Sequence, residues 1–225
     1  PPPDAKGGWR AASDGAGVLR TAGMDLARLD QAFEYARRTS AHGGLLVARH
    51  GWLVYERYYG RGHREANPAM ASVGKAYTSI ACGILLEEMR DRIPEGLDQK
   101  VFTPAYLPEA FPLSDPAKSE IRLGHLLTMT AGMQEAALGF VRGEAVQLKA
   151  VKRDASLGQD ESAVSVPLWC KPGEGYSYSS QSTHVASMVL RHVTGMEMEE
   201  YIRRKLAEPM GWGRWTYARN IGRVT

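Results

Sequence analysis

The sequence lacks most of the features that mark a disulfide scaffold, a metal centre or a membrane protein. Its 225 residues include only two cysteines, Cys82 and Cys170, which excludes a disulfide-rich fold. A single disulfide between them and a pair of free buried thiols both stay open. No apolar stretch approaches the roughly 18 residues of a membrane span, and no Cys or His spacing fits a zinc site. The sequence therefore predicts no membrane span and no metal.

An excess of charge of one sign is also missing. Lys and Arg total 28 against 25 acidic residues, so the net charge is only +3. The densest basic run, Arg203-Arg204-Lys205, falls in the last turn of a predicted helix, where cations favour the helix dipole. This balance gives no reason to expect a nucleic-acid partner. The 44% hydrophobic and 24% charged residues are typical of a globular protein with a substantial core.

The first part of the chain predicts a lead-in, a helix and a hairpin. Residues 1–22 are rich in Pro, Gly, Ala and Asp, which is typical of a loosely packed segment. Two apolar runs, 45–48 and 52–55, flank His50-Gly51 and indicate a β-hairpin. Between the lead-in and the hairpin, apolar residues recur at helical spacing: Leu26, Leu29, Phe33 and Ala36.

From Ser72 onward the pattern is mainly helical. Gly83, inside the first helix, suggests close packing against another element. The prolines of 91–120 favour extended loop, and the polar segment 134–165 is expected to form loops and short helices on one face. Four helices are expected. The first begins near Ser72 and ends before Ile93, and the second covers 123–129. The third contains Val185, Met188, Val189 and Val193 and ends at a C-cap glycine, Gly195, and the fourth covers about 197–206.

Ser72-Val73-Gly74-Lys75 is the only Ser-x-x-Lys in the chain. On a helix this spacing places the hydroxyl and the amine one turn apart on the same face. A serine hydroxyl is a weak nucleophile until a base removes its proton, and a lysine in a dry site can approach its neutral, basic form. The start of the helix also offers backbone N–H groups to an oxyanion. The structural alternative is that Ser72 caps the helix while Lys75 reaches solvent.

The second candidate element is the segment Pro172–Ser180, which contains Tyr178. A tyrosine beside a cationic lysine is drawn toward the phenolate, so it can act first as a base and then as an acid. The alternative is a Gly-rich turn with aromatic rings packed beneath it.

Two other motifs are excluded. Gly74-Lys75 does not belong to a phosphate-binding P-loop, because Ala69 and Ala76 stand where Gly and Ser or Thr are needed. The segment Gly175–Ser179 is not a nucleophile elbow, because Ser179 replaces the second glycine and no strand-like run precedes it.

Five motifs occur in one order along the chain: Ser72-x-x-Lys75, then Leu126–Met133 (Leu-Leu-Thr-Met-Thr-Ala-Gly-Met), Pro172-Gly173 leading to Tyr178-Ser179-Ser180, Val193-Thr194-Gly195, and Leu206–Gly211. Together they resemble the family of serine beta-lactamases and penicillin-binding proteins, which includes class C beta-lactamases, DD-peptidases, several esterases and nylon-oligomer hydrolases. The Leu-Leu-Thr-Met-Thr-Ala-Gly form is especially similar to the last group. The resemblance covers about residues 25–217.

The resemblance implies a role for each matching residue. Ser72 is the residue that becomes acylated, and its own backbone N–H is one oxyanion donor. Lys75 holds and relays the serine proton, and Tyr178 is the general base that later protonates the leaving group. Ser180 stands where the family usually has Asn, which orients the lysine and contacts substrate; the shorter serine lacks the amide donor. Tyr176 is an alternative base, but the Tyr-Ser-Ser register favours Tyr178.

The resemblance also implies the fold: an α/β (α+β) architecture of beta-lactamase/transpeptidase type, with an antiparallel sheet flanked by helices and a mainly helical region. Nothing here matches the family's third motif, a Lys/His-Thr/Ser-Gly strand that supplies the other oxyanion donor. We therefore expect C-terminal strands to be missing from this chain, and no turnover by these residues alone. The expected division is a lead-in at 1–22, the first part of the α/β domain at 23–79, the helical region at 80–205 and a return to the α/β domain at 206–225.

The function implied is that of a serine hydrolase without a metal or organic cofactor, acting on a small-molecule carboxylic ester or amide: a beta-lactam, a D-peptide, a linear amide or an ester. The alternative is a non-hydrolytic penicillin-binding or sensor-type protein of the same fold. The N-terminus leaves the compartment open, with a periplasmic or secreted location among the choices. Trp169, Tyr176 and Trp212 are candidates for a pocket lining, although core packing is the favoured role for each.

Overall fold

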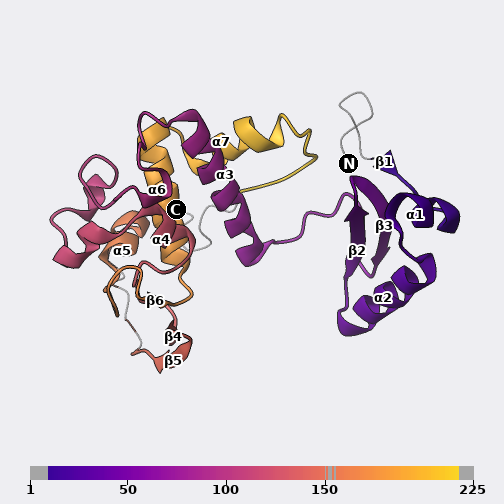
Figure 1. Cartoon of the computed structure of the whole chain (residues 1–225), viewed down its shortest axis with the longest axis horizontal. Helices are drawn as coiled ribbons and strands as arrows, with labels where there is room; N and C mark the ends of the chain where they lie inside the picture. The colour runs from indigo at the N-terminus through magenta and orange to yellow at the C-terminus, as the bar shows by residue number, and fades with distance from the viewer. Residues whose placement is uncertain (1–9, 150, 152–153, 155, 218–225) are drawn as a thin grey trace. The chain divides into compact units, whose positions relative to one another are not determined.

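The computed structural model describes residues 10–149, 151, 154 and 156–217. Contacts divide the chain into two compact units, Pro1–Ala69 with Ala207–Thr225, and Met70–Leu206 (Figure 1). The four-part division expected from the sequence stays a prediction. No helix in the described part of the chain is both long and apolar enough to cross a bilayer.

The first unit is a small three-stranded sheet covered by two helices. The sheet order is β1-β3-β2, with β2 and β3 antiparallel and β1 parallel to β3. His50 and Gly51, with φ of 52° and 76°, form the turn between β2 and β3, as a two-residue hairpin turn requires. The predicted helix and hairpin are confirmed. The bounds are β1 Arg10–Ala11, α1 Gly15–Ala22, α2 Leu26–Thr39, β2 Gly43–Arg49 and β3 Trp52–Tyr59.

The prediction of a loosely packed lead-in over 1–22 is wrong for its second half. Helix α1 begins after Asp14, whose carboxylate accepts a hydrogen bond from the Gly17 N–H at 2.8 Å. Val18 is fully buried against the core of this unit. A helix of only eight residues thus forms because it is capped and packed, which composition alone does not reveal.

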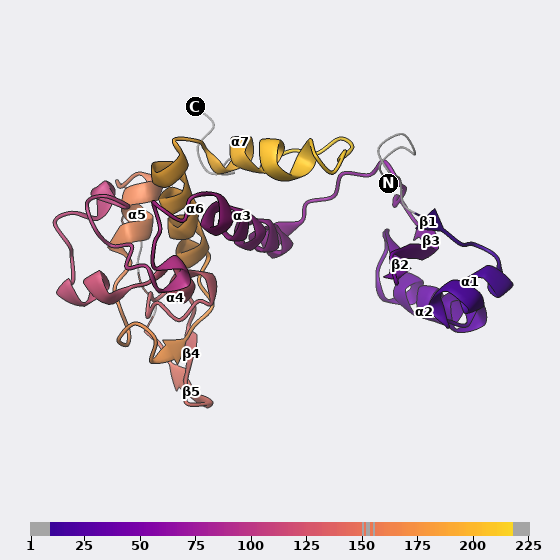
Figure 2. The same cartoon turned by 45° about the horizontal axis from the view of Figure 1, so that its top comes forward.

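The second unit is built around α6, which packs against α3, α4 and α5, while α7 packs against α3 (Figures 1 and 2). All four helices expected from the sequence are confirmed, with shifted ends. Three 3₁₀ turns interrupt the loop expected over 91–120. The helices are α3 Gly74–Glu88, α4 Leu123–Leu127, α5 Gln159–Ser165, α6 Ser180–Thr194 and α7 Met198–Ile202, followed by a π-helical turn Arg203–Ala207.

Two strands of a second small sheet, β4 and β5, lie within the segment 134–165, which was expected to hold only loops and short helices. The order of this sheet is β5-β4-β6, all antiparallel, with β4 Leu138–Val141, β5 Glu144–Gln147 and β6 Gly175–Tyr176. The turn between β4 and β5 is Arg142-Gly143, with φ of 50° and 86°. This hairpin corrects the interpretation of 134–165.

The close packing predicted at Gly83 is also wrong. Gly83 is exposed, and a Cβ built on it meets no atom within 4 Å in the described residues. By contrast, Gly195 has the left-handed φ of 72° expected of a C-cap glycine, and its N–H donates to the Arg191 carbonyl at 2.7 Å.

Candidate active site

Ser72 lies in a 3₁₀ turn, Ala71–Val73, that runs directly into α3. The residue before it, Ala71, has a φ of 44°, a conformation that costs a non-glycine residue about 1–3 kcal/mol. The cap positions of the turn and of α3 are Met70 and Val73, and neither makes a side-chain cap bond. Ser72 is therefore not the helix cap of the structural alternative.

The Ser72 hydroxyl instead lies beside the two groups that the sequence singled out. The Lys75 ammonium, in the first turn of α3, donates to Ser72 Oγ at 3.1 Å. The Tyr178 hydroxyl donates to the same Oγ at 2.5 Å, across 106 residues of sequence. Lys75 Nζ also lies 5.3 Å from the centre of the Tyr178 ring. The structure thus places the Lys75 amine and the Tyr178 phenol within hydrogen-bond distance of the Ser72 hydroxyl oxygen.

Tyr178 belongs to an extended segment between β6 and α6, in which buried and exposed residues alternate from Gly175 to Ser179. The buried members anchor the segment. Ser177 Oγ donates to the Leu138 carbonyl at 3.0 Å, and Ser179 Oγ accepts from the Ser182 N–H at 3.1 Å, which caps α6. Because side chains in an extended chain alternate, Tyr178 projects to the opposite side.

The loop formed by the Thr-Met-Thr-Ala-Gly motif holds this segment in place. The Ser177 N–H donates to the Met129 carbonyl at 3.3 Å, and the Gly173 N–H donates to the Thr130 carbonyl at 2.8 Å. Gly132 has a φ of 76°, and a Cβ there would lie 2.3 Å from the Cys170 carbonyl oxygen. Only glycine fits such a close backbone approach in this conformation. The motif therefore positions the tyrosine, although it contributes no side chain to the Ser72 contacts.

Sequence reasoning missed Glu135, which follows that loop. Its carboxylate accepts a hydrogen bond from the Gln181 N–H at 3.0 Å, at the N-terminus of α6 and one residue beyond Ser180. A carboxylate there complements the positive end of the helix. The pairing joins residues 46 apart in sequence, so the tertiary fold alone makes it visible.

The pKa of Tyr178 lies below its ordinary value of 10. The hydrogen bond with Ser72 is the largest cause, followed by the bond with Lys75. Burial opposes them, and the charge of Lys75 and the Ser180 hydroxyl add smaller lowering contributions. The phenolate is thus more accessible here than in a solvated tyrosine. Ser180 therefore acts on the tyrosine, a contribution that the comparison with Asn did not suggest.

The described residues leave the site open to solvent, which differs from the dry site expected from the chemistry. Ser72 is exposed and Tyr178 keeps 40% of its surface exposed, while Lys75 is half-buried. Within the same described residues there is no group of three or more His, Cys, Asp or Glu side chains that could hold a metal ion.

The three aromatic residues named as candidates for a pocket lining differ in their surroundings. Tyr176, the alternative base, is 41% exposed and pairs with Phe140 at a ring distance of 6.4 Å, so the core packing expected for it is wrong. Trp169 is confirmed as a packing residue, because its ring lies against Gly139 and Gly175. Trp212 contacts Trp215 edge-to-face at 5.9 Å in the first unit.

Together the mixed α/β fold and the Ser–Lys–Tyr arrangement are of the serine beta-lactamase and penicillin-binding-protein type. The model of the family described as Beta-lactamase matches residues 5–221, and the chain belongs to this family.

Comparison with individual proteins agrees with this assignment. Esterase EstB of Burkholderia gladioli is 31% identical over 204 residues, which is 82% of this chain and 50% of the esterase. The solved structure of EstCE1, a hydrolase with promiscuous acyltransferase activity, has a TM-score of 0.60 at 25% identity, covering 83% of this chain and 51% of EstCE1. The octameric penicillin-binding protein homologue from Pyrococcus abyssi has a TM-score of 0.60 at 24% identity, covering 84% of this chain and 43% of the homologue. The chain spans about half the length of these relatives.

Proposed function

We propose that the protein is a serine hydrolase that cleaves a carboxylic ester or amide through a covalent acyl-Ser72 intermediate. The observation that carries this proposal is the position of Ser72 Oγ, within hydrogen-bond distance of both the Lys75 amine and the Tyr178 hydroxyl. A nucleophile in contact with two proton-transfer groups is the arrangement that acyl transfer requires. Relatives named as an esterase and as a hydrolase favour an ester as the substrate.

In the proposed acylation, the Tyr178 phenolate takes the Ser72 proton while Oγ forms a bond to the carbonyl carbon. The Lys75 ammonium stabilises the phenolate beforehand and remains beside the oxygen that gains and loses charge. Collapse of the tetrahedral adduct breaks the bond to the leaving group, which receives the proton from Tyr178. The products of this step are acyl-Ser72 and the free alcohol or amine.

Deacylation repeats the sequence with water. Tyr178, again a phenolate, takes a proton from a water molecule that attacks the acyl carbon, and Ser72 Oγ leaves with that proton. The backbone N–H of Ser72, at the start of α3, is the proposed oxyanion donor on this chain. Ser180, whose hydroxyl lowers the pKa of Tyr178, is proposed to contact the substrate beside the tyrosine.

A fluorophosphonate probe tests the nucleophile in the full-length protein. We expect the wild type to be labelled and Ser72→Ala to lose all labelling, whereas Ser119→Ala, which alters a serine of the same unit, keeps it. Persistent labelling of Ser72→Ala would overturn the assignment of Ser72 as the nucleophile.

Four compounds test for turnover: p-nitrophenyl butyrate, nitrocefin, a D-Ala-D-Ala peptide and a linear amide. We expect the ester to react fastest. Labelling without turnover of any of the four favours the alternative, a penicillin-binding or sensor-type protein.

A further inference from the structure

We infer that the outer face of the sheet formed by β4 and β6 is a subsite for an apolar, aromatic leaving group of the substrate; this inference rests on the proposed function and names the substrate class. The face consists of the Leu138, Phe140 and Tyr176 side chains, here called the aromatic platform. Phe140 and Tyr176 are direct partners in the register of the two strands. Their ring centres lie 6.4 Å apart and the ring planes are tilted by 39°, so the two rings are close enough for one aromatic ligand to contact both.

The platform is exposed although it is apolar. Leu138 and Phe140 each keep 38% of their surface exposed and Tyr176 keeps 41%, while the residues between them, Gly139 and Gly175, are buried. A strand that follows this alternation normally turns its apolar side chains to the core and its polar ones to water. Here the order is reversed, with glycines inside and large apolar groups outside.

The inner face explains this reversal. Gly139 and Gly175 lie on the Trp169 ring, and a Cβ at either position would come within 2.8 Å and 2.5 Å of it, respectively. The sheet therefore obtains its packing from the indole beneath the two glycines. Leu138, Phe140 and Tyr176 instead keep 38–41% of their surface exposed, and an exposed apolar patch of this kind marks a binding surface.

The position of Tyr178 connects the platform to the reacting atoms. Tyr176 and Tyr178 are two residues apart in an extended segment, so both project to the same side, about 7 Å from each other. Tyr178 is the group proposed to protonate the leaving group, which makes the leaving group the part of the substrate nearest to it. A chain of a few atoms beyond the leaving oxygen then reaches Tyr176 and Phe140. An aromatic ring is the group that gains most from two tilted rings.

Two acetate esters test the platform without changing the reactivity of the bond: 2-phenylethyl acetate and ethyl acetate have the same acyl group and similar alcohols as leaving groups. We expect the wild type to have a kcat/KM for the phenylethyl ester about 10-fold or more above that for the ethyl ester. Phe140→Ala and Tyr176→Ala should each lower this ratio about 3- to 10-fold, because each slows the phenylethyl ester more than the ethyl ester. Tyr35→Ala, which truncates an aromatic residue 67% exposed on α2, is the matched control and should leave the ratio unchanged.

The outcomes separate the two proposals. If fluorophosphonate labelling of Ser72 fails, the proposed function fails. If both esters are cleaved but the wild type shows no preference between them, the subsite proposal is overturned and the proposed hydrolase function is kept. The same conclusion follows if the two platform variants lower the rates for both esters equally. Should Phe140→Ala melt at a lower temperature, Phe140→Leu keeps most of the volume without the ring and must still reduce the ratio.

Discussion

Tyr178 differs from Tyr55 and Tyr201 in the direction in which its surroundings shift the pKa of the phenol. Burial, followed by interactions with carboxylates, raises the pKa of Tyr55 and Tyr201 to about 12. The pKa of Tyr178 is lowered instead, because the hydrogen bonds with Ser72 and Lys75 and the charge of Lys75 outweigh the effect of burial. One residue type thus has opposite acid–base properties in different surroundings, and only the surroundings of Tyr178 suit a base.

For Tyr178→Phe we expect the acylation rate to fall by about 10²-fold or more, since the variant keeps the ring and loses the proton acceptor. The wild-type rate should increase with pH through a pKa below 10, because the phenolate is the active form, and this limb should vanish in the variant. The measurement is the pH dependence of fluorophosphonate labelling, with Tyr35→Phe as the control. A loss below about threefold would assign the base to Lys75 alone.

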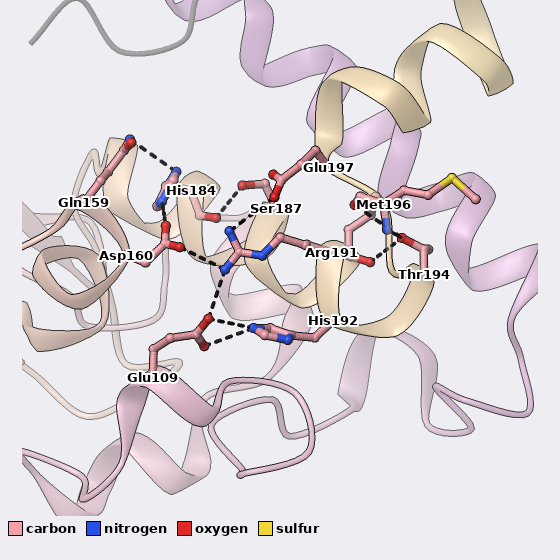
Figure 3. A network of polar contacts seen from close by, with 11 residues as sticks. Glu109, Gln159, Asp160, His184, Ser187, Arg191, His192, Thr194, Met196 and Glu197 are labelled. Atoms are coloured by element: carbon pink, nitrogen blue, oxygen red, sulfur yellow. Dashed lines mark hydrogen bonds and ion pairs between the residues drawn. The ribbon is translucent and has the colours of Figure 1, made fainter. Parts of the chain in front are cut away.

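At the scale of elements, α6 begins directly after the segment that holds Tyr178, and three of its side chains, His184, Arg191 and His192, belong to a polar network. Arg191 bonds to Glu109 at 2.9 Å and to Asp160 at 2.8 Å, so it joins α6 to α5 and to the 3₁₀ turn Pro108–Ala110 (Figure 3). His192 contacts Glu109 at 2.8 Å, and His184 contacts Asp160 at 2.7 Å. These side chains are about three-quarters buried, which makes their pairing energetically important.

The network predicts a pH-dependent contribution to stability. Burial raises the pKa of both carboxyls, but the lowering effects together outweigh it. For Glu109 these are a backbone hydrogen bond, then His192 and Arg191, and for Asp160 they are the bonds and charges of His184 and Arg191, so both pKa values are lowered. A carboxyl with a lowered folded-state pKa stabilises the protein above its unfolded pKa. This stabilisation is lost as the pH falls through the lowered values.

We therefore expect Arg191→Gln to lower the free energy of unfolding at pH 7 by about 1.5–3 kcal/mol, because two partly buried carboxylates lose a charged partner. The difference from the wild type should shrink as the pH falls below about 4.5. Urea denaturation at several pH values measures both effects. Arg90→Gln, which breaks an ion pair with both side chains 73% exposed, is the control and should cost less than about 1 kcal/mol. An Arg191→Gln effect no larger than that of Arg90→Gln contradicts the prediction.

The elements that sequence patterns predicted best are those whose apolar residues repeat over several turns, such as α2, α3 and α6. Two short elements were not predicted. The α1 helix has eight residues in a Gly- and Ala-rich stretch, and β4 has four residues whose apolar side chains face outward. Their formation depends on a cap in one case and on the Trp169 ring in the other. Both are contacts with residues that the local pattern does not contain.

At the scale of the whole molecule, the two cysteines are free, which decides between the alternatives left by the sequence. Burial raises the pKa of the Cys82 thiol to about 12. The pKa of Cys170 is also raised, by burial first and by the charge of Glu174 second. Both thiols are therefore protonated at neutral pH, and protonated thiols react slowly.

We expect Ellman's reagent to titrate two thiols in guanidinium chloride and to react far more slowly with the native protein at pH 7.5. A reducing agent should leave the melting temperature unchanged, because no covalent link is broken. A melting temperature that falls on reduction, or fewer than two thiols after unfolding, contradicts free cysteines.

The sequence by itself determined the family resemblance, the long helices, the hairpin of β2 and β3, and the residue types of the candidate site. These depend on spacing along the chain: three residues from Ser72 to Lys75, and the Tyr-Ser-Ser register that separates Tyr178 from Tyr176. The five motifs identified the family because their order is a property of the chain itself.

Only the tertiary structure decided which of these groups meet and in what state. The Tyr178 hydroxyl reaches Ser72, 106 residues away in sequence, because the Met129–Gly132 loop forms hydrogen bonds with the extended segment that contains Tyr178. The same long-range packing sets the pKa of Tyr178 and leaves Phe140 and Tyr176 exposed above two glycines. Hydrogen bonding, solvent exposure and charge all depend on distances in space, and distances between remote residues are fixed by the fold.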